Sequence, residues 1–392
     1  MKKECTVILK KKREKSVLLG HPWIFSGAVK EVHDYSEPGD ICCILNEDGR
    51  FLAKGYINKR SSIIVRILTF ENIAIDTRFI HRVLTDALLF RKRIGSINSN
   101  AIRLLNGEGD FFPGLIIDRY DRGIVIQALT AGVQRLKGLI VDELKKQLDP
   151  AFIYERSATL ASSFEGEGFT DGFLYGKIDG PVIIEEMGIR FMVDVKNGQK
   201  TGFFLDQRHN RGILGSLARG MEILNCFSYT AAFGIHALKG GAKRVTNIDS
   251  SQSALEGARE NLVLNRINPE SSPMVRADVF DFLREDKTIY DIIVLDPPRF
   301  ASSKSELKHA ARGYKDINMN AMRLLKKGGF LFTFSCSSLI TPDLFQKIVF
   351  AAASDAGKSV KVVKKLHADV DHPVNLAHRE GEYLKGLWLC IA

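Results

Sequence analysis

The sequence lacks three features that would place it in familiar classes of protein. It has no Cys-x-x-Cys pair and no Cys/His cluster with zinc-ligand spacing, which argues against a zinc site. No run of residues is apolar and long enough to span a bilayer, and the opening segment MKKECTVILKKKREK contains no apolar signal-peptide core. Its six cysteines are therefore expected to be free thiols in a reducing compartment. We predict a cytoplasmic protein that binds no metal and no membrane.

The composition of the 392-residue chain is otherwise ordinary for a globular protein, with 45% hydrophobic and 26% charged residues. Its length predicts two or three domains. The formal net charge of +10 and the isoelectric point of about 9.2 favour binding to a polyanion such as nucleic acid. Charge alone leaves a generally basic surface as an equal alternative.

Residues 1–70 contain short β-rich runs separated by turn sequences such as EPGD and NEDGR, which predicts a small β-barrel. The segment is rich in Lys and Arg, and Trp23 and Phe25 follow the sequence LLGHP. A basic module with aromatic side chains is typical of RNA binding through phosphate contacts and base stacking. A solvated surface around a core Trp23 explains the same residues equally well.

The remainder of the chain divides into two regions of different pattern. Residues 71–182 mix helical patterns with short strands, which predicts a central α+β domain. Over residues 183–392, short apolar runs alternate with helical patterns, and this alternation predicts an α/β domain with a parallel sheet covered on both faces. The last two runs, SVKVVKKLHADV and KGLWLCIA, have no helical pattern between them and are expected to form a hairpin at one edge of the sheet.

Polar residues end the successive strands expected in this sheet, where ligands of such folds bind. The first strand ends near Asn225, the second at Asp249, the third at Asp278 and the fourth at Asp296. A carboxylate after the second strand commonly accepts ribose hydroxyls, and one after the third can accept from an adenine amino group. The turn FSYTAAFG lacks the G-x-G-x-x-G pattern that a dinucleotide pyrophosphate needs, which favours S-adenosylmethionine over NAD. Taken singly, each Asp is more often a helix N-cap.

The fourth strand ends in LDPPRF, which fixes a carboxylate in a rigid loop. Proline has no N–H and restricts the residue before it, so Asp296-Pro297-Pro298 is expected to be extended and stiff. Asp296 would then be held as a hydrogen-bond acceptor against a flat substrate base. Motifs of this sort mark methyltransferases that act on nitrogen or ring atoms of nucleobases.

Eight motifs together resemble one known family over essentially the full length of the chain. They are NGQKTGFFLDQRHNR (197–211), CFSYTAAFG (226–234), LDPPRF (295–300), ARGYKDIN (311–318), FTFSCSS (332–338), DLFQKI (343–348), DHPV (371–374) and EGEYLKG (380–386). The chain resembles the RlmI-like ribosomal RNA cytosine-C5 methyltransferases, which carry a PUA domain, a central α+β domain and a C-terminal class I, Rossmann-like methyltransferase domain. The resemblance implies domains over 1–70, 71–182 and 183–392, with large-subunit ribosomal RNA as the partner. It leaves a homodimer open.

The resemblance also implies a set of residues around bound S-adenosylmethionine. Members of the family commonly have Asp in place of Asn225 and Gly-Gly in place of Ala231-Ala232, so the first loop is expected to avoid left-handed dihedral angles at the alanines. The cofactor candidates are Thr201, Phe203, Asp206 and Arg208 near the methionine end, Phe227 and Ser228 in the first loop, Asp249 and Ser250 at the ribose, Asp278 and Val279 at the adenine, and Asp296 and Pro297 in the central cleft.

Cys336 follows the strand run FLFTFS, at the edge where Asp296 is also expected. C5 of cytosine is a weak nucleophile, but a thiolate that adds to C6 makes C5 nucleophilic, so covalent catalysis divides one difficult step into easier ones. We therefore predict that Cys336 and Asp296 are catalytic. Composition alone would make Cys336 a small core hydrophobe, and Cys226 on the first strand is expected to pack in that way.

Two residues are candidate contacts to the substrate RNA, which must present an extruded base to this cleft. Arg299 would contribute charge and Tyr314 a stacking face, and each has an equally weighted structural explanation. Three other functions stay open from the sequence. They are guanine-nitrogen methylation on the same fold, an RNA-binding ribosome assembly factor with a vestigial cofactor site, and, least favoured, a dinucleotide-dependent oxidoreductase.

Overall fold

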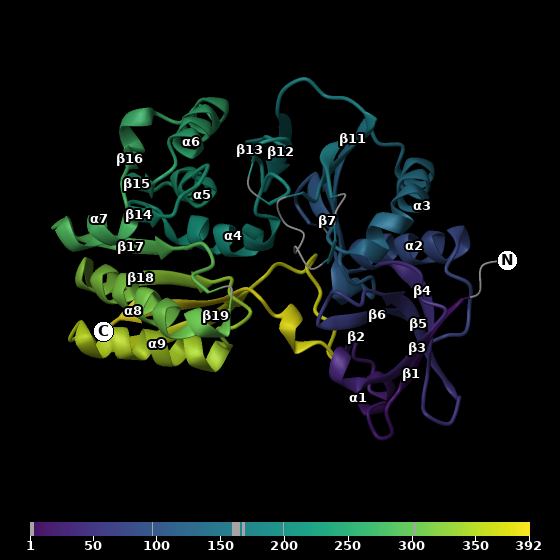
Figure 1. Cartoon of the computed structure of the whole chain (residues 1–392). Coiled ribbons are helices and arrows are strands. Elements are labelled where there is room, and N and C mark those ends of the chain that lie inside the picture. Colours follow the sequence, from purple (N-terminus) through teal and green to yellow (C-terminus); the bar gives the residue numbers. More distant parts are fainter. Residues whose placement is uncertain (1–3, 96, 159–164, 167–168, 199, 302) are drawn as a thin grey trace. The chain divides into compact units, whose positions relative to one another are not determined.

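The computed structural model describes residues 4–392 except 96, 159–164, 167–168, 199 and 302. The chain forms two compact units (Figure 1). The first unit contains Met1–Ile184, Val193–Phe204 and Val370–Gly381, and the second contains Glu185–Met192, Leu205–Asp369 and Glu382–Ala392. The division into three domains at residues 70 and 182 stays a prediction.

The first unit begins with a six-stranded sheet in the order β2-β6-β5-β4-β1-β3. Alternation of buried and partly exposed residues along its strands, as in CTVIL and DICCIL, gives the sheet one core-facing side. The residues on that side form an apolar core cluster that includes Val7, Ile44 and Val65. The elements are β1 (Cys5–Leu9), α1 (Lys15–Leu18), β2 (Trp23–Phe25), β3 (Val29–His33), β4 (Asp40–Leu45), β5 (Phe51–Ile57) and β6 (Ile63–Thr69).

The same unit contains a five-stranded sheet in the order β11-β10-β9-β8-β7. Two long amphipathic helices, α2 (Thr77–Arg93) and α3 (Ala131–Leu148), contribute their apolar faces to the core beside this sheet. The strands are β7 (Ala101–Asn106), β8 (Leu115–Tyr120), β9 (Gly123–Ala128), β10 (Phe152–Arg156) and β11 (Asp171–Gly176). A separate two-stranded sheet is made by β12 (Val182–Glu186) and β13 (Ile189–Val193), whose residues are divided between the two units.

The second unit is built on a seven-stranded sheet in the order β16-β15-β14-β17-β18-β20-β19. Its first five strands are parallel, and β20 runs antiparallel to both of its neighbours, which confirms the predicted edge hairpin. The strands are β14 (Glu222–Cys226), β15 (Arg244–Asp249), β16 (Met274–Arg276), β17 (Tyr290–Leu295), β18 (Leu325–Ser335), β19 (Val360–His367) and β20 (Lys385–Ile391).

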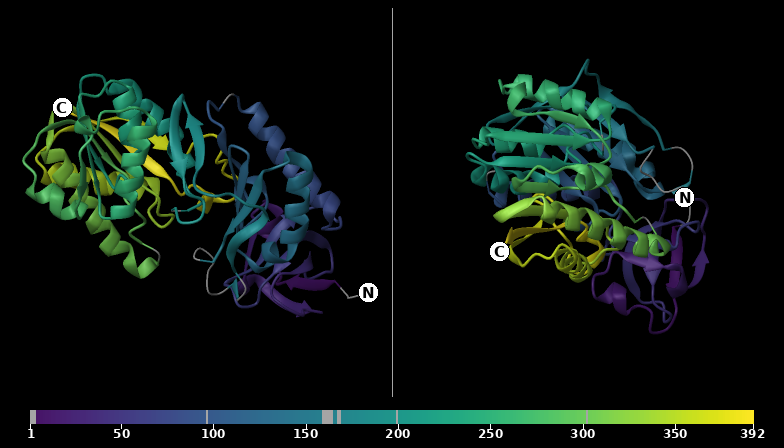
Figure 2. Two further views of the ribbon diagram at one scale, coloured as in Figure 1. Left: turned by 90° about the horizontal axis from the view of Figure 1, so that it is seen from above. Right: turned by 90° about the vertical axis from the view of Figure 1, so that its left-hand side faces the viewer.

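Helices cover both faces of this sheet (Figure 2), because alternate residues of its buried strands are apolar on both sides. On β17, Ile293 and Leu295 pack in one cluster, and Ile292 and Val294 pack in the other. The predicted α/β class is confirmed. The helices are α4 (Arg208–Leu217), α5 (Ala232–Lys239), α6 (Gln252–Leu264), α7 (Val279–Glu285), α8 (Leu307–Arg323) and α9 (Pro342–Asp355). No helix in the described part of the chain is long and apolar enough to cross a membrane.

Candidate functional site

In the loop between β14 and α5, three residues other than glycine adopt a left-handed backbone conformation. Phe227, Tyr229 and Ala231 have φ angles of 57°, 48° and 59°. The expectation that the alanine pair would avoid this region was wrong, because Ala231 adopts it at the start of α5. Such conformations persist only where surrounding contacts fix them, and they concentrate at ligand sites. Here the backbone N–H of Ser228 donates to the carbonyl oxygen of Ile248 at 2.9 Å.

Asp249 at the end of β15 fastens this loop to the sheet. Its carboxylate accepts from the backbone N–H of Tyr229 at 2.8 Å and from that of Ser251 at 2.9 Å. A carboxylate has about four acceptor positions, so these two bonds leave capacity for ribose hydroxyls. Ser250, the next residue, is exposed.

Two buried hydroxyls in the same loop have no hydrogen-bond partner in the described part of the chain. They are Ser228 Oγ and Thr230 Oγ1. A buried polar group without a partner is costly, so each hydroxyl is available to a bound molecule. With the partly exposed Asp249, they provide polar contacts without a phosphate-binding glycine loop. The residues present therefore fit S-adenosylmethionine.

Asp278 follows β16 and is the N-cap of α7. Its Oδ1 accepts from the backbone N–H of Phe280 at 2.8 Å and of Asp281 at 3.3 Å. The side chain is exposed, whereas Val279 is 3% exposed and packs in the core. The N-cap alternative left open for a single Asp is therefore correct for Asp278, and a contact with adenine stays a prediction.

The segment GQKTGFFLDQR divides between the two units. Thr201 belongs to the first unit, where its hydroxyl donates to Asp118 Oδ2 at 2.6 Å and lies 2.7 Å from the hydroxyl of Tyr120. Phe203, also in the first unit, is 3% exposed. The geometry gives these side chains local packing roles, and their contact with the cofactor stays a prediction.

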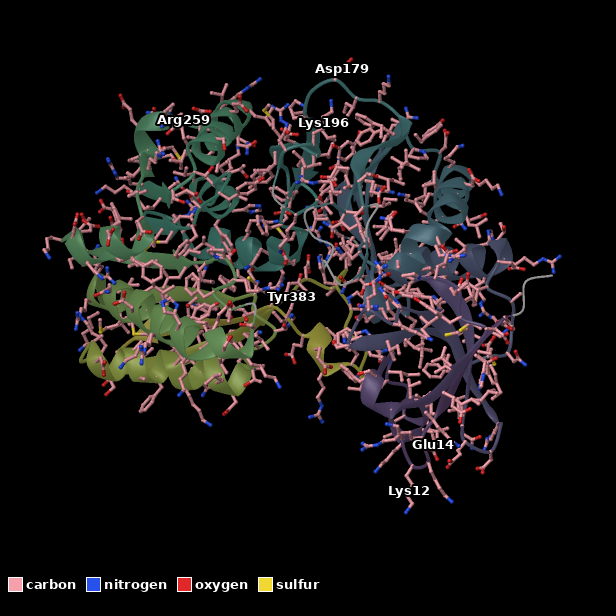
Figure 3. The ribbon with its side chains drawn as sticks, in the orientation of Figure 1. Lys12, Glu14, Asp179, Lys196, Arg259 and Tyr383 are labelled. Atoms are coloured by element: carbon pink, nitrogen blue, oxygen red, sulfur yellow. The ribbon has the colours of Figure 1, made fainter. Side chains whose placement is uncertain are left out.

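The second half of that segment is buried in the second unit. Asp206 Oδ2 accepts from the hydroxyl of Tyr383 (labelled in Figure 3) at 2.7 Å. Arg208 is 1% exposed, and its Nη1 donates to Asp369 Oδ2 at 2.7 Å. An arginine with such a partner is engaged in structure, so its assignment to the cofactor is not supported by its contacts and remains only a prediction.

Arg208 adjoins a buried ionic cluster around Glu186. The Glu186 carboxylate accepts from Arg211 Nε at 2.7 Å and Nη2 at 2.6 Å, and from His236 Nε2 at 2.9 Å. Burial alone raises the pKa of Glu186, but Arg211 and His236 outweigh that effect and lower it to about 2. Burial lowers the pKa of His236, against the opposing effect of Glu186.

Asn225 is also structural. Its side-chain amide donates to Asn247 Oδ1 on the neighbouring strand at 2.8 Å, and both side chains are buried. The difference from the Asp common in the family therefore produces a cross-strand hydrogen bond inside the sheet.

Cys336 lies directly after β18 and is partly exposed. Its Sγ is 3.9 Å from the carbonyl oxygen of Pro297, so the structure brings the thiol beside the Asp296-Pro297-Pro298 loop. Asp296 is partly exposed and Pro297 is buried. By contrast Cys226 is fully buried in the core, and burial raises the pKa of its thiol well above the ordinary range.

Tyr314 on α8 is fully buried beneath this loop, whereas Arg299 is exposed. The ring of Tyr314 lies 4.6 Å from that of Phe300, and its hydroxyl accepts from Ser335 Oγ at 3.0 Å. Burial raises the pKa of Tyr314 to about 12. These contacts favour the structural alternative for Tyr314 over stacking on RNA, and Arg299 remains a candidate contact.

Replacing Tyr314 with Phe removes the bond to Ser335 and retains the ring. We expect a loss of about 0.5–1.5 kcal/mol in the free energy of unfolding, the usual net value of one buried hydrogen bond. Urea denaturation measures it, with the exposed Tyr175 replaced by Phe as a control. Unchanged stability of the Tyr314 variant would contradict the structural role.

Sequence reasoning missed Lys385, the first residue of β20. Its Nζ donates to the carbonyl oxygens of Ser337 at 2.6 Å and Ile340 at 2.8 Å. The only available signal was its position in the motif EGEYLKG.

Parallel strands in this order, with polar residues at their carboxyl ends and a loop free of phosphate-binding glycines, define a class I methyltransferase domain. A family model described as S-adenosylmethionine-dependent methyltransferase matches residues 169–378, and one described as PUA-like domain matches residues 7–70.

The chain belongs to the family of the ribosomal RNA large subunit methyltransferase I proteins. It is 44% identical over 389 residues to the member from Tolumonas auensis, with 97% of this chain and 98% of the relative covered. It is 45% identical over 386 residues to the member from Shewanella amazonensis, with 97% of each covered. The protein is an S-adenosylmethionine-dependent methyltransferase.

Two solved structures share the fold across almost the whole chain. A SAM-dependent methyltransferase from Streptococcus mutans has a TM-score of 0.85 at 23% identity, with 98% of this chain and 99% of that chain covered. A methyltransferase complexed with SAH has a TM-score of 0.86 at 23% identity and the same coverage.

Proposed function

We propose that this protein methylates C5 of a cytidine in 23S, large-subunit, ribosomal RNA through a covalent bond between Cys336 and C6 of the base. The relatives are named for methylation of large-subunit ribosomal RNA. The single observation that carries the covalent step is the place of Cys336. Its partly exposed thiol lies beside the Asp-Pro-Pro loop at the carboxyl ends of the strands. Because ribosomal RNA is the proposed substrate, we place the protein in the cytoplasm. That it forms a homodimer stays a prediction.

The chemistry begins with ionisation of the Cys336 thiol, whose proton passes to solvent. The thiolate forms an Sγ–C6 bond, and the electron pair of the C5–C6 double bond moves toward C5 and the ring. S-adenosylmethionine, when bound, would supply the methyl group that C5 acquires, with its S–CH3 bond broken and S-adenosylhomocysteine as the leaving group. Loss of the C5 proton to water then restores the double bond as the Sγ–C6 bond breaks and the thiolate leaves.

Asp296 is assigned to the edge of the base that carries N3 and the exocyclic amine. The two prolines after it restrict the loop, so its carboxylate is held ready before the base arrives. The adduct places extra electron density on the ring, so N3 takes up a proton from solvent, and the protonated N3 and the exocyclic amine donate hydrogen bonds to the Asp296 carboxylate. Arg299, exposed on the same loop, is assigned to a neighbouring phosphate.

The test is mass-spectrometric mapping of 23S ribosomal RNA from a strain that lacks this protein. We expect one 5-methylcytidine to disappear and to return when the wild-type gene is restored. A missing N-methylguanosine would instead support the guanine-nitrogen alternative. Unchanged modification with defective subunits would support an assembly factor.

The first unit is assigned to holding the RNA beside the modified base. A surface cavity of about 520 Å³ lies between the segment containing α1 and the segment around β2. Trp23 is held in place there, because its Nε1 donates to Glu108 Oε1 at 2.9 Å. Phe25 is 46% exposed. Basic and aromatic side chains line the cavity, namely Lys12 (labelled in Figure 3), Arg13, Lys15, Trp23 and Phe25.

Neutralising Lys12 and Lys15 with Ala should weaken RNA binding and flatten its dependence on salt. Each phosphate contact in a single strand contributes about 0.7 to the slope of log K against log salt, so loss of two should reduce the slope by about 1.4. Fluorescence anisotropy from low to moderate salt measures it. The matched control is Lys145→Ala with Lys146→Ala on the exposed side of α3, which we expect to leave the slope unchanged. Equal slopes for both pairs would remove the cavity from the RNA-binding surface.

A further inference from the structure

A buried lysine stands next to the Cys336 thiol. Lys385 is 5% exposed, and β20 pairs with β18 so that Lys385 lies opposite Ser335, the residue before Cys336. Its two hydrogen bonds go to Ser337 and Ile340, in the turn that follows the cysteine. Lys385 therefore holds the turn on one side of the thiol, while Pro297 contacts the thiol itself.

The surroundings of Lys385 are unusual for a buried ammonium. Among the described residues, no carboxylate forms an ion pair with it, and its two carbonyl partners use two of the three N–H groups. A buried charge without an ionic partner is costly. Burial is the largest effect and lowers the pKa of Lys385 to about 8, against the raising effect of Cys336. The ammonium and the Cys336 sulfur are thus close enough to interact electrostatically.

We propose, on the basis of the covalent function above, that Lys385 is a positioning residue that orders the turn after Cys336 and stabilises its thiolate by charge. The thiol proton goes to solvent, and the ammonium keeps its own protons. The thiolate supplies a counter-charge to the ammonium. The interaction is strongest where the attacking nucleophile forms, which is how a fixed charge assists catalysis.

Other charged and titratable groups surround this pair. Arg299, from the loop after β17, lowers the pKa of Lys385, and Glu382, just before β20, raises it. Cys336 and Asp296 each raise the pKa of Tyr314 on α8, so both also lie within electrostatic range of that hydroxyl. Arg299 favours a thiolate, whereas Glu382 and Asp296 oppose one, and Lys385 contributes a positive charge from β20.

The test measures ionisation of Cys336 directly, without RNA or cofactor. The rate of iodoacetamide alkylation is followed against pH by mass spectrometry of the Cys336 peptide, in the full chain and in Lys385→Gln and Lys385→Arg. Gln keeps a donor for the carbonyl oxygens but removes the charge, and Arg keeps the charge. A nearby cation commonly shifts such a midpoint by about one pH unit or more. We expect the midpoint to rise by at least about one unit in Lys385→Gln and to stay near wild type in Lys385→Arg.

A purely structural role would change the plateau rate through exposure of the thiol and leave the midpoint unchanged. Equal midpoints in wild type and Lys385→Gln would therefore overturn the inference. Should Lys385→Gln fail to fold, the reciprocal measurement decides. Lysine side-chain NMR of Cys336→Ser, which is nearly isosteric, should show Lys385 titrating at lower pH than in wild type, and no difference would overturn the inference.

These outcomes are separable from failure of the proposed function. Methyl transfer that survives in Cys336→Ala would refute the covalent mechanism, whatever the alkylation profile shows. A normal alkylation midpoint in Lys385→Gln, with an inactive Cys336→Ala, would leave the mechanism standing and remove only the role of Lys385.

Discussion

Cys336→Ala is expected to lower the rate of methyl transfer to ribosomal RNA by at least about 10³-fold, because loss of a covalent nucleophile removes the step that activates the base. The substitution removes the Cys336 thiol but leaves Asp249, Ser228 and the rest of the cofactor loop unchanged. Binding of S-adenosylmethionine by calorimetry should therefore stay within about twofold of wild type. The assay transfers a labelled methyl group to RNA from a strain lacking the protein, under single-turnover conditions.

Cys390→Ala is the matched control, because Cys390 is also a partly exposed free thiol but lies on β20 away from the strand-end loops. It should retain wild-type turnover. Substrate RNA carrying 5-fluorocytidine gives a second readout, since fluorine at C5 prevents the final proton loss. Wild type should form a covalent RNA–protein band on a denaturing gel and Cys336→Ala should form none. Full turnover by Cys336→Ala would instead favour guanine-nitrogen methylation.

The strand-end residues could be predicted because buried parallel strands are short apolar runs, and the residues directly after each run lie at one edge of the sheet. That reasoning brought Asp249, Asp296 and Cys336 into one region. It failed for backbone angles, since Ala231 adopts a left-handed conformation that only the surrounding contacts enforce. Burial of Tyr314 was equally invisible, because an aromatic residue on an amphipathic helix can face either side.

Contacts between segments far apart in the sequence account for the other differences. Lys385 comes beside Cys336 only because β20 runs antiparallel to β18 in a particular register, and no local pattern specifies that register. The assignment of Arg208 to the cofactor stays a prediction, but its ion pairs with Asp369 and Glu186 come from distant segments that no local pattern places beside it.

Glu186→Ala should destabilise the second unit by about 3–5 kcal/mol, because it leaves buried Arg211 without its counter-charge. Arg211 is 1% exposed and donates two hydrogen bonds to Glu186. The two tryptophans make the measurement specific, since Trp23 lies in the first unit and Trp388 in the second. In a Trp23→Phe background, urea denaturation followed by Trp388 fluorescence reports the second unit alone. Asp343→Asn, which breaks the exposed pair with Lys347, is the control and should cost no more than about 0.5 kcal/mol.

The same cluster predicts how the second unit responds to acid. The pKa of Glu186 is lowered in the folded state from 4.5 to about 2, so its contribution is complete above about pH 4.5 and disappears as the pH falls toward 2. That depression corresponds to about 3 kcal/mol. His236 acts in the same direction at higher pH, because its folded pKa lies below 6.5 and the unfolded chain takes up the proton first. The free energy of unfolding reported by Trp388 should thus fall as the pH is lowered from about 6.5. In Glu186→Ala, the part of this fall that occurs below pH 4.5 should be absent. An identical acid profile in the variant would show that Glu186 is not the group responsible.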